Sequence, residues 1–166
     1  MFSGLARGLI AVTLLCAADV AGAPPALPSH GPAPAFSKPD LQGSTVDLAA
    51  YRGKVVLLNF WATWCEPCLT EIPRFKEWQQ QYGRRGLQVV GVSMDDEEAP
   101  VRDLYRKLSL NFPVVMGDEK LGELYGGVLG LPVTFLIGPD GKIRLRQDGA
   151  ADLKTLEQSI LRLLPR

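Results

Sequence analysis

Histidine is nearly absent from this sequence: its single copy, His30, stands in a stretch rich in proline and alanine. A cysteine–histidine protease needs an imidazole to deprotonate its thiol, and imidazole is also a frequent metal ligand and general base. One histidine in such a stretch excludes a cysteine–histidine protease, a histidine-rich metal site and a histidine general base. His30 itself is interpreted as a solvated linker residue.

The chain also lacks an excess of charge of either sign, because 18 basic residues balance 18 acidic ones. Nucleic-acid-binding proteins normally carry a surplus of basic residues on one face. The balance gives no support to a nucleic-acid partner, or to a strongly electrostatic membrane or acidic partner. With 46% apolar and 22% charged residues among 166, the composition is typical of one globular domain preceded by a leader.

Cysteine is scarce as well, with three in the chain: Cys16 near the start and the pair Cys65 and Cys68. Two cysteines cannot complete a four-ligand structural zinc site without other ligands. A disulfide between them would close too short a loop to restrict the unfolded chain much. The C-x-x-C spacing therefore predicts a redox function rather than a structural one.

The first residues, 1–23, are predicted to be an export signal. Arg7 supplies the positive charge at its start, and residues 8–18 form an apolar run that is too short to span a bilayer. Cys16 is interpreted as an ordinary member of this run, because the large side chain of Leu15 before it disfavours lipid attachment.

Small residues at the end of the leader indicate cleavage after Ala23, with Gly22 and Ala18 as alternative sites. An uncleaved leader would instead serve as an N-terminal membrane tether. Proline and alanine dominate residues 24–35, which are expected to form an extended linker. The folded domain is expected to occupy residues 36–166.

Apolar patterning within the domain alternates strands with helices. Residues 55–61 form a continuous apolar run, which is typical of a strand buried on both faces. Leucine, isoleucine and aromatic residues spaced three apart indicate a helix over 66–82, and Asp152 is expected to cap the last helix. Further strands are expected at 46–48, 87–93, 113–116, 133–137 and 143–146, and further helices at 97–108 and 121–125. This order predicts an α/β domain with a mixed sheet, ending in a hairpin and a helix.

The C-x-x-C pair falls between the buried strand and the helix that follows it. A helix start presents unpaired N–H groups and the positive end of the helix dipole, and both favour a thiolate. We expect Cys65 to be the attacking sulfur, and Cys68, one turn inside the helix, to resolve the mixed disulfide. Pro67 suits the first helical turn, where its missing N–H costs little, and it stiffens the loop between the cysteines.

Several stretches of the domain match the pattern of one known family. They are Ala35-Phe36, Asp40-Leu41-x-Gly43-x-x-Val46-x-Leu48, the run RGKVVLLNFWATWCEPC over 52–68, Glu71-Ile72-Pro73, and LPVTFLI after Gly130. Through them residues 36–164 resemble the TlpA/ResA-like branch of the thioredoxin superfamily. The resemblance implies a thioredoxin-like fold, in which helices flank a central mixed sheet, with an N-terminal strand extension and a βα insertion. Members of this branch are exported reductants that serve cytochrome c maturation, cytochrome oxidase assembly or related thiol repair.

The same resemblance implies roles for residues around the cysteine pair. Leu131 and Pro132 match a cis X-Pro bond, which would let residue 131 pair with a substrate strand beside the attacking sulfur. Glu71 matches a glutamate that manages the proton on the second cysteine. Thioredoxin itself has a buried acid where Asn59 stands here, and an amide cannot titrate.

Residues flanking Cys65 complete the predicted site. Trp64 is expected to be part lid and part substrate platform, with plain core packing as the alternative. Glu66 and Pro67, between the cysteines, resemble the loop of reducing members of the branch. The expected substrates are protein thiols and disulfides, such as apocytochrome c or copper-site assembly proteins, with a membrane thiol transporter as electron donor. We expect a monomer without a resident cofactor or metal.

Three other functions stay open at this point. The chain could be a disulfide oxidant or isomerase, since the residues between the cysteines only suggest a direction. A peroxiredoxin-like peroxidase needs a threonine or serine three residues before its reactive cysteine, whereas Thr63 stands two before Cys65. A Cu(I) carrier could use both sulfurs as soft ligands, although no histidine or methionine pair stands nearby.

Overall fold

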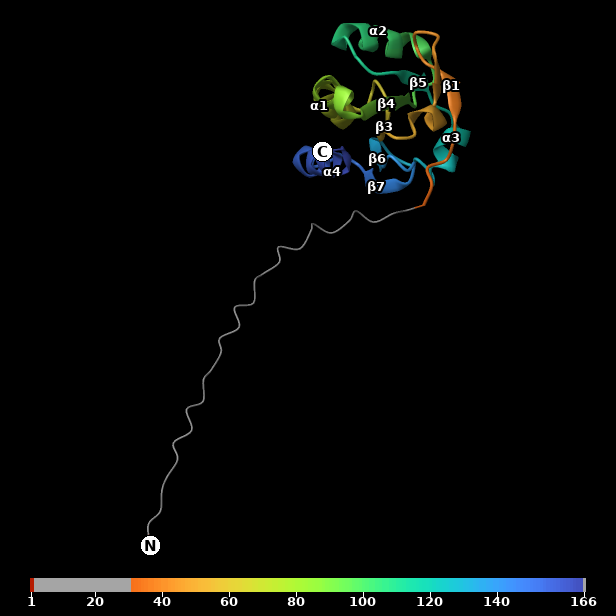
Figure 1. Cartoon of the computed structure of the whole chain (residues 1–166). Helices are drawn as coiled ribbons and strands as arrows, with labels where there is room; N and C mark the ends of the chain where they lie inside the picture. The colour runs from red at the N-terminus through yellow and green to blue at the C-terminus, as the bar shows by residue number, and fades with distance from the viewer. Residues whose placement is uncertain (2–30, 166) are drawn as a thin grey trace.

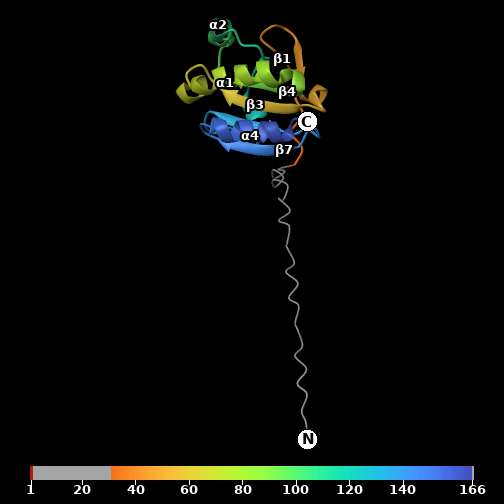
Figure 2. The same cartoon turned by 60° about the vertical axis from the view of Figure 1, so that its left-hand side comes forward.

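A five-stranded mixed sheet in the order β5-β4-β3-β6-β7 lies at the centre of the computed structural model, which describes Met1 and residues 31–165. Apart from Met1, the expected export signal, Cys16 and the linker up to His30 lie outside the described residues. In Figures 1 and 2, α1 (Glu66–Tyr82) and α4 (Leu153–Leu163) lie on the same face of the sheet. The thioredoxin-like α/β architecture predicted from the sequence is confirmed.

The central strand is β3 (Val55–Trp61), and every one of its residues is buried. It pairs in parallel with β4 (Leu87–Ser93) and in antiparallel with β6 (Val133–Ile137). Alternate side chains of a strand point to opposite faces of the sheet, so β3 supplies two core clusters at once. The first contains Val55, Leu57 and Trp61, and the second contains Val56, Leu58 and Phe60.

Two outer strands extend the sheet, one on each side. β5 (Val114–Met116) pairs in parallel with β4, and β7 (Ile143–Asp148) pairs in antiparallel with β6. The helix α2 (Glu98–Leu108) buries Val101 in the first core cluster. None of the helices in the described residues is long and apolar enough to cross a membrane.

The second face of the sheet is covered by α3 (Glu119–Leu124) and by an N-terminal hairpin, as Figure 1 shows. The hairpin consists of β1 (Ser37–Pro39) and β2 (Thr45–Asp47), which pair in antiparallel and form a sheet of their own. Asp40 closes the turn between them, because its Oδ1 atom accepts hydrogen bonds from two backbone N–H groups of that turn. This hairpin is the N-terminal strand extension expected from the resemblance.

The short elements begin and end at residues other than those expected. The helix expected over 121–125 is α3, which begins two residues earlier, at Glu119. It begins there because Asp118 caps it by accepting a hydrogen bond of 2.7 Å from the N–H of Leu121. The strand expected over 46–48 ends at Asp47, since Leu48 begins a short 3₁₀ helix. At the C-terminal hairpin, β7 continues two residues beyond the expected end.

The chain joins the domain before Phe36, where the domain was expected to begin. The N–H of Ala33 donates to the carbonyl of Gly141, and Ile143 donates to the carbonyl of Gly31. The hydroxyl of Tyr125 donates to the carbonyl of Pro34 at 2.8 Å. Because proline lacks an N–H but keeps its carbonyl, a proline-rich segment can still be held by donors from the domain.

Gly91, on β4, has no Cβ atom, and this leaves room for the indole of Trp61 beside that strand. A Cβ atom at this position would lie 2.9 Å from Nε1 of Trp61 and 3.1 Å from Cγ2 of Val114. Since both neighbours are fully buried, neither can move aside easily.

We therefore expect Gly91→Ala to lower the free energy of unfolding by about 1–3 kcal/mol, which is typical of overpacking a core. Urea unfolding monitored by tryptophan fluorescence would measure the loss. Gly130→Ala is the matched control, because a Cβ at Gly130 meets nothing within 4 Å and its backbone does not lie in the left-handed region. Equal stabilities for the two variants would contradict this account of the core.

Candidate active site

Cys65 is the N-cap residue of α1, and Cys68 lies one turn inside the helix. The two residues form a disulfide with an Sγ–Sγ distance of 1.96 Å. The Sγ atom of Cys65 also accepts a hydrogen bond of 3.3 Å from the backbone N–H of Cys68. First-turn N–H groups and the helix dipole stabilise negative charge at this position. A reduced Cys65 is therefore placed where a thiolate is favoured.

Exposure differs between the cysteines and the residues beside them. Cys65 keeps 5% of its surface and Cys68 keeps 1%, whereas Glu66 and Pro67 between them are exposed. Trp64 is 70% exposed, so it does not serve as a core residue in this structure. Of the two sulfurs, that of Cys68 is the more deeply buried, and the exposed indole of Trp64 stands next to Cys65 in the chain.

Glu71 lies on the same helix, three residues after Cys68, and is buried with 3% of its surface exposed. Its Oε1 atom accepts a hydrogen bond of 2.5 Å from the backbone N–H of Ala151. Its Oε2 atom is buried and has no hydrogen-bond partner among the described residues. Burial raises the pKa of this carboxyl, and the N–H of Ala151 partly opposes that rise. Glu71 is thus a buried acid rather than a solvated residue of the helix surface.

A cis peptide bond joins Leu131 to Pro132, immediately before β6. Since Phe60 pairs with Val133, the sheet register places Pro132 beside the end of β3 that leads to the cysteines. The carbonyl of Pro132 accepts a hydrogen bond of 2.8 Å from Gly149, and its ring is buried. The cis bond expected at this position is present in the structure.

Leu131 packs against both core clusters, and the first of these contains Cys65 and Cys68. On β3, the amide of Asn59 donates a hydrogen bond of 2.9 Å to the hydroxyl of Thr134 on β6. This buried pair is neutral and cannot exchange a proton with the cysteines as a carboxyl could. The buried acid closest to the cysteines in the sequence is Glu71. The described part of the chain contains no group of three or more His, Cys, Asp and Glu side chains that could hold a metal ion.

Asp95, which was not predicted from the sequence, fixes the turn between β3 and the cysteines. Its carboxylate accepts hydrogen bonds from the N–H of Thr63 at 2.9 Å and from the hydroxyl of Thr63 at 2.5 Å. The hydroxyl of Ser93 donates to the same carboxylate at 2.7 Å. One sequence signal was available: parallel strands end at the same edge of a sheet, so an acid just after β4 faces the turn that follows β3.

Asp95→Ala would leave three buried or half-buried donors on Thr63 and Ser93 without their acceptor. We expect it to lower the free energy of unfolding of the oxidised protein by about 1–3 kcal/mol, as measured by urea unfolding. Asp96→Ala is the control, because Asp96 is the next acid in the chain and is exposed. If both variants unfold at the same urea concentration, the carboxylate of Asp95 does not hold the turn.

Comparison with known proteins agrees with this geometry. Residues 30–146 match the model of the AhpC/TSA family. The thiol-disulfide oxidoreductase ResA of Bacillus thuringiensis subsp. konkukian (strain 97-27) is 35% identical over 135 residues, which cover 80% of this chain and 77% of that protein.

Solved structures give the same result. A crystal structure assigned as the thiol:disulfide interchange protein DsbE of Chlorobium tepidum has a TM-score of 0.77 and 35% identity, and covers 84% of this chain and 100% of its own. The exposed lipoprotein thioredoxin of Streptococcus pneumoniae strain TIGR4 has a TM-score of 0.69 and 30% identity, and covers 78% of this chain and 100% of its own. With a C-x-x-C disulfide at the start of a helix, the chain belongs to the AhpC/TSA family and is a thiol-disulfide oxidoreductase of the thioredoxin-like, ResA/DsbE type.

Proposed function

We propose that this chain is an exported reductant of protein disulfides, and that Cys65 and Cys68 carry its electrons. The main support is the disulfide at the first turn of α1, with one sulfur at the helix N-cap and the other inside the helix. A helix start favours the thiolate at Cys65, and a thiolate is the species that attacks a disulfide.

The reaction moves two electrons in two exchanges. The thiolate of reduced Cys65 attacks one sulfur of a substrate disulfide, which forms a mixed disulfide and releases the first substrate thiolate. The sulfur of Cys68, once deprotonated, then attacks Sγ of Cys65, which releases the second substrate thiolate and closes the Cys65–Cys68 disulfide. The two substrate sulfurs are reduced and the two cysteines are oxidised, so a dithiol donor, proposed to be a membrane thiol transporter, must reduce the pair again.

Glu71 is the proposed acceptor of the proton that Cys68 must lose. Its position on the same face of α1, one turn after Cys68, brings the two side chains to neighbouring places. Burial raises the pKa of the carboxyl, so it binds a proton more readily than an exposed glutamate does. The unpartnered Oε2 atom is the one free to take that proton.

Substrate contact is assigned to residues around Cys65. The exposed indole of Trp64 offers an apolar platform, and Leu131, before the cis-proline, offers a backbone that can pair with an extended segment. Glu66 and Pro67, expected from the sequence to lie in a loop, are the exposed first residues of α1 between the two sulfurs, whose environment they shape.

Export is proposed from the leader pattern at residues 1–23 and from the similar pneumococcal protein, which is described as an exposed lipoprotein. An extracytoplasmic reductant would act on disulfides formed in an oxidising compartment, such as those of apocytochrome c or of copper-site assembly proteins.

Reduction potential tests the direction of electron flow. A reductant is expected to have a Cys65–Cys68 potential close to that of thioredoxin, about −270 mV, whereas an oxidant would lie nearer to about −120 mV. Equilibration with glutathione buffers, followed by alkylation of free thiols, would measure it.

Cys65→Ser is expected to abolish insulin reduction, and Cys68→Ser to trap the mixed disulfide on Cys65. Full activity of Cys65→Ser would overturn the proposed function.

Glu71→Gln tests the role of the buried carboxyl and keeps an oxygen for the N–H of Ala151. Because the pKa of Glu71 is raised, its ionisation costs the folded state stability as pH rises above the ordinary glutamate range. The variant should therefore be more stable than the wild type at pH 8, and this difference should shrink towards pH 4.

The variant should also change the pH dependence of Cys68 alkylation in the reduced protein, followed site by site by mass spectrometry. Glu77→Gln is the control, because Glu77 is exposed on the same helix, nine residues beyond Cys68, and pairs with Arg74. Identical thiol titrations for Glu71→Gln and wild type would refute the proton role, even if the stability difference is found.

A further inference from the structure

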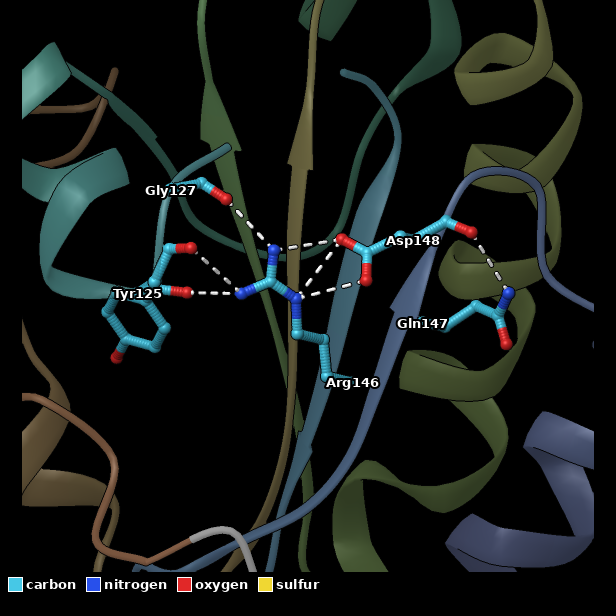
Figure 3. Close-up of polar contacts among 6 residues, drawn as sticks. Tyr125, Gly127, Arg146, Gln147 and Asp148 are labelled. Atoms are coloured by element: carbon cyan, nitrogen blue, oxygen red, sulfur yellow. Dashed lines mark hydrogen bonds and ion pairs between the residues drawn. The ribbon is translucent and has the colours of Figure 1, made fainter. Parts of the chain in front are cut away.

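One arginine outside the cysteine pair holds the loop that leads to the cis-proline. Arg146 lies on β7, and its guanidinium faces three consecutive backbone carbonyls, as Figure 3 shows. Nη1 donates to the carbonyl of Tyr125 at 2.8 Å and to that of Gly126 at 3.4 Å. Nη2 donates to the carbonyl of Gly127 at 2.9 Å. The guanidinium therefore acts as a clasp on residues 125–127.

The charge of this clasp is balanced and its plane is supported. Asp148 accepts hydrogen bonds from Nε and Nη2 of Arg146 at 2.9–3.1 Å. The guanidinium carbon also lies 5.4 Å from the ring centroid of Phe135, within cation–π distance. Because its plane and several of its donors are engaged, the guanidinium has one orientation, which a flexible ammonium group could not reproduce.

The local backbone explains why three carbonyls point to one place. α3 ends at Leu124, and the last carbonyls of a helix have no partner within the helix. Gly126 and Gly127 then adopt φ values of +84° and +82°, a left-handed conformation that suits glycine. Two such residues in succession turn the chain back, and their carbonyls are satisfied by Arg146.

The residues after the clasp lead to the cis-proline and β6. Val128–Leu131 belong to no helix or strand, and no backbone hydrogen bond holds them within the described part of the chain. Leu129 is fully exposed, and a surface hollow lies between this segment and the end of β7, with Leu131 and Asp148 among its lining residues. Val128 and Leu131 pack against the core, whereas Leu129 and Gly130 are exposed. The path of the segment is therefore set at its two ends, by the Arg146 clasp and the packing of Val128 on one side and by Leu131 and the cis bond to Pro132 on the other.

We propose that Arg146 is a positioning residue for protein substrates, which holds Val128–Leu131 in the path that an extended substrate segment meets beside Cys65. This proposal rests on the proposed function and adds a specificity element to it. Arg146 lies on β7, whereas the reacting sulfurs lie at the start of α1. The hydrogen bonds of Arg146 go to residues 125–127 and to Asp148, not to the cysteines. A small disulfide that needs no contact with Val128–Leu131 would not depend on it.

The test compares insulin with oxidised glutathione as substrates, with dithiothreitol recycling the enzyme. Arg146→Gln is expected to lower kcat/KM for insulin about tenfold, mostly through KM, because ground-state contacts with the segment are lost. Its kcat/KM for glutathione should stay within about twofold of wild type. Arg144→Gln is the matched control on the same strand, since Arg144 pairs with Asp140 at the hairpin turn.

A second pair of variants perturbs the clasp without removing the arginine. A Cβ at Gly126 would lie 2.7 Å from Nη1 of Arg146, whereas a Cβ at Gly127 would meet nothing within 4 Å. Both glycines have nearly the same φ, so Gly126→Ala and Gly127→Ala carry similar backbone strain. Gly126→Ala should therefore raise the KM for insulin more than Gly127→Ala does. If Arg146→Gln does not fold, the comparison of these two variants tests the proposal in its place.

Two results would overturn the proposal. In the first, Arg146→Gln matches Arg144→Gln on insulin, or Gly126→Ala matches Gly127→Ala. In the second, Arg146→Gln loses activity equally on insulin and glutathione, which would make Arg146 a purely structural residue. A wild-type protein that reduces neither substrate would instead refute the proposed function itself.

Discussion

The register of β3 between β4 and β6 is the constraint on which the site depends. It brings three segments that are distant in sequence to one edge of the sheet: the turn before Cys65, the acid Asp95 after β4, and Pro132 before β6. A slip of one residue would turn every side chain of β3 to the opposite face and exchange the two core clusters. Because both clusters are closely packed, such a slip would place side chains of the wrong size in each of them, and this resists any change of register at the edge.

At this edge, the reacting atoms are surrounded by groups that differ in how firmly they are held. The turn before Cys65 is tied to Asp95 through both the backbone and the side chain of Thr63. The segment before Pro132, in contrast, depends on contacts at its two ends. Glu71 adds a carboxyl that is half-satisfied, with one oxygen bound to Ala151 and the other without a partner. The sulfurs are thus held by the sheet and its turns, whereas the segment before Pro132 is held by a side chain of β7 and by core contacts at its ends.

Long elements could be predicted from the sequence, because their apolar patterns are long enough to be unambiguous. β3, β4, β6 and α1 begin and end at the predicted residues. Short elements depend on single contacts: α3 begins where Asp118 caps it, and β1 exists because it pairs with β2. The cysteine pair could be identified from its motif, and the cis bond from the family resemblance. Arg146 could not, because the carbonyls that it binds lie 19–21 residues away and only the tertiary structure brings them to it. Asp95 had one signal in the sequence, its place just after the predicted strand 87–93, but its contact with Thr63 depends on the parallel pairing of β3 with β4.

The contacts of residues 31–34 fix the point at which the N-terminal part of the chain meets the domain. These residues bind the turn after β6, next to Gly141, whereas Pro132 and the cysteines lie at the other end of that strand. β6 has five residues, so roughly 17 Å of strand separates the two ends. The redox pair therefore lies at the opposite pole of the domain from the point where the N-terminal segment enters it. Whatever the N-terminal segment contacts at that entry point leaves the sulfurs uncovered.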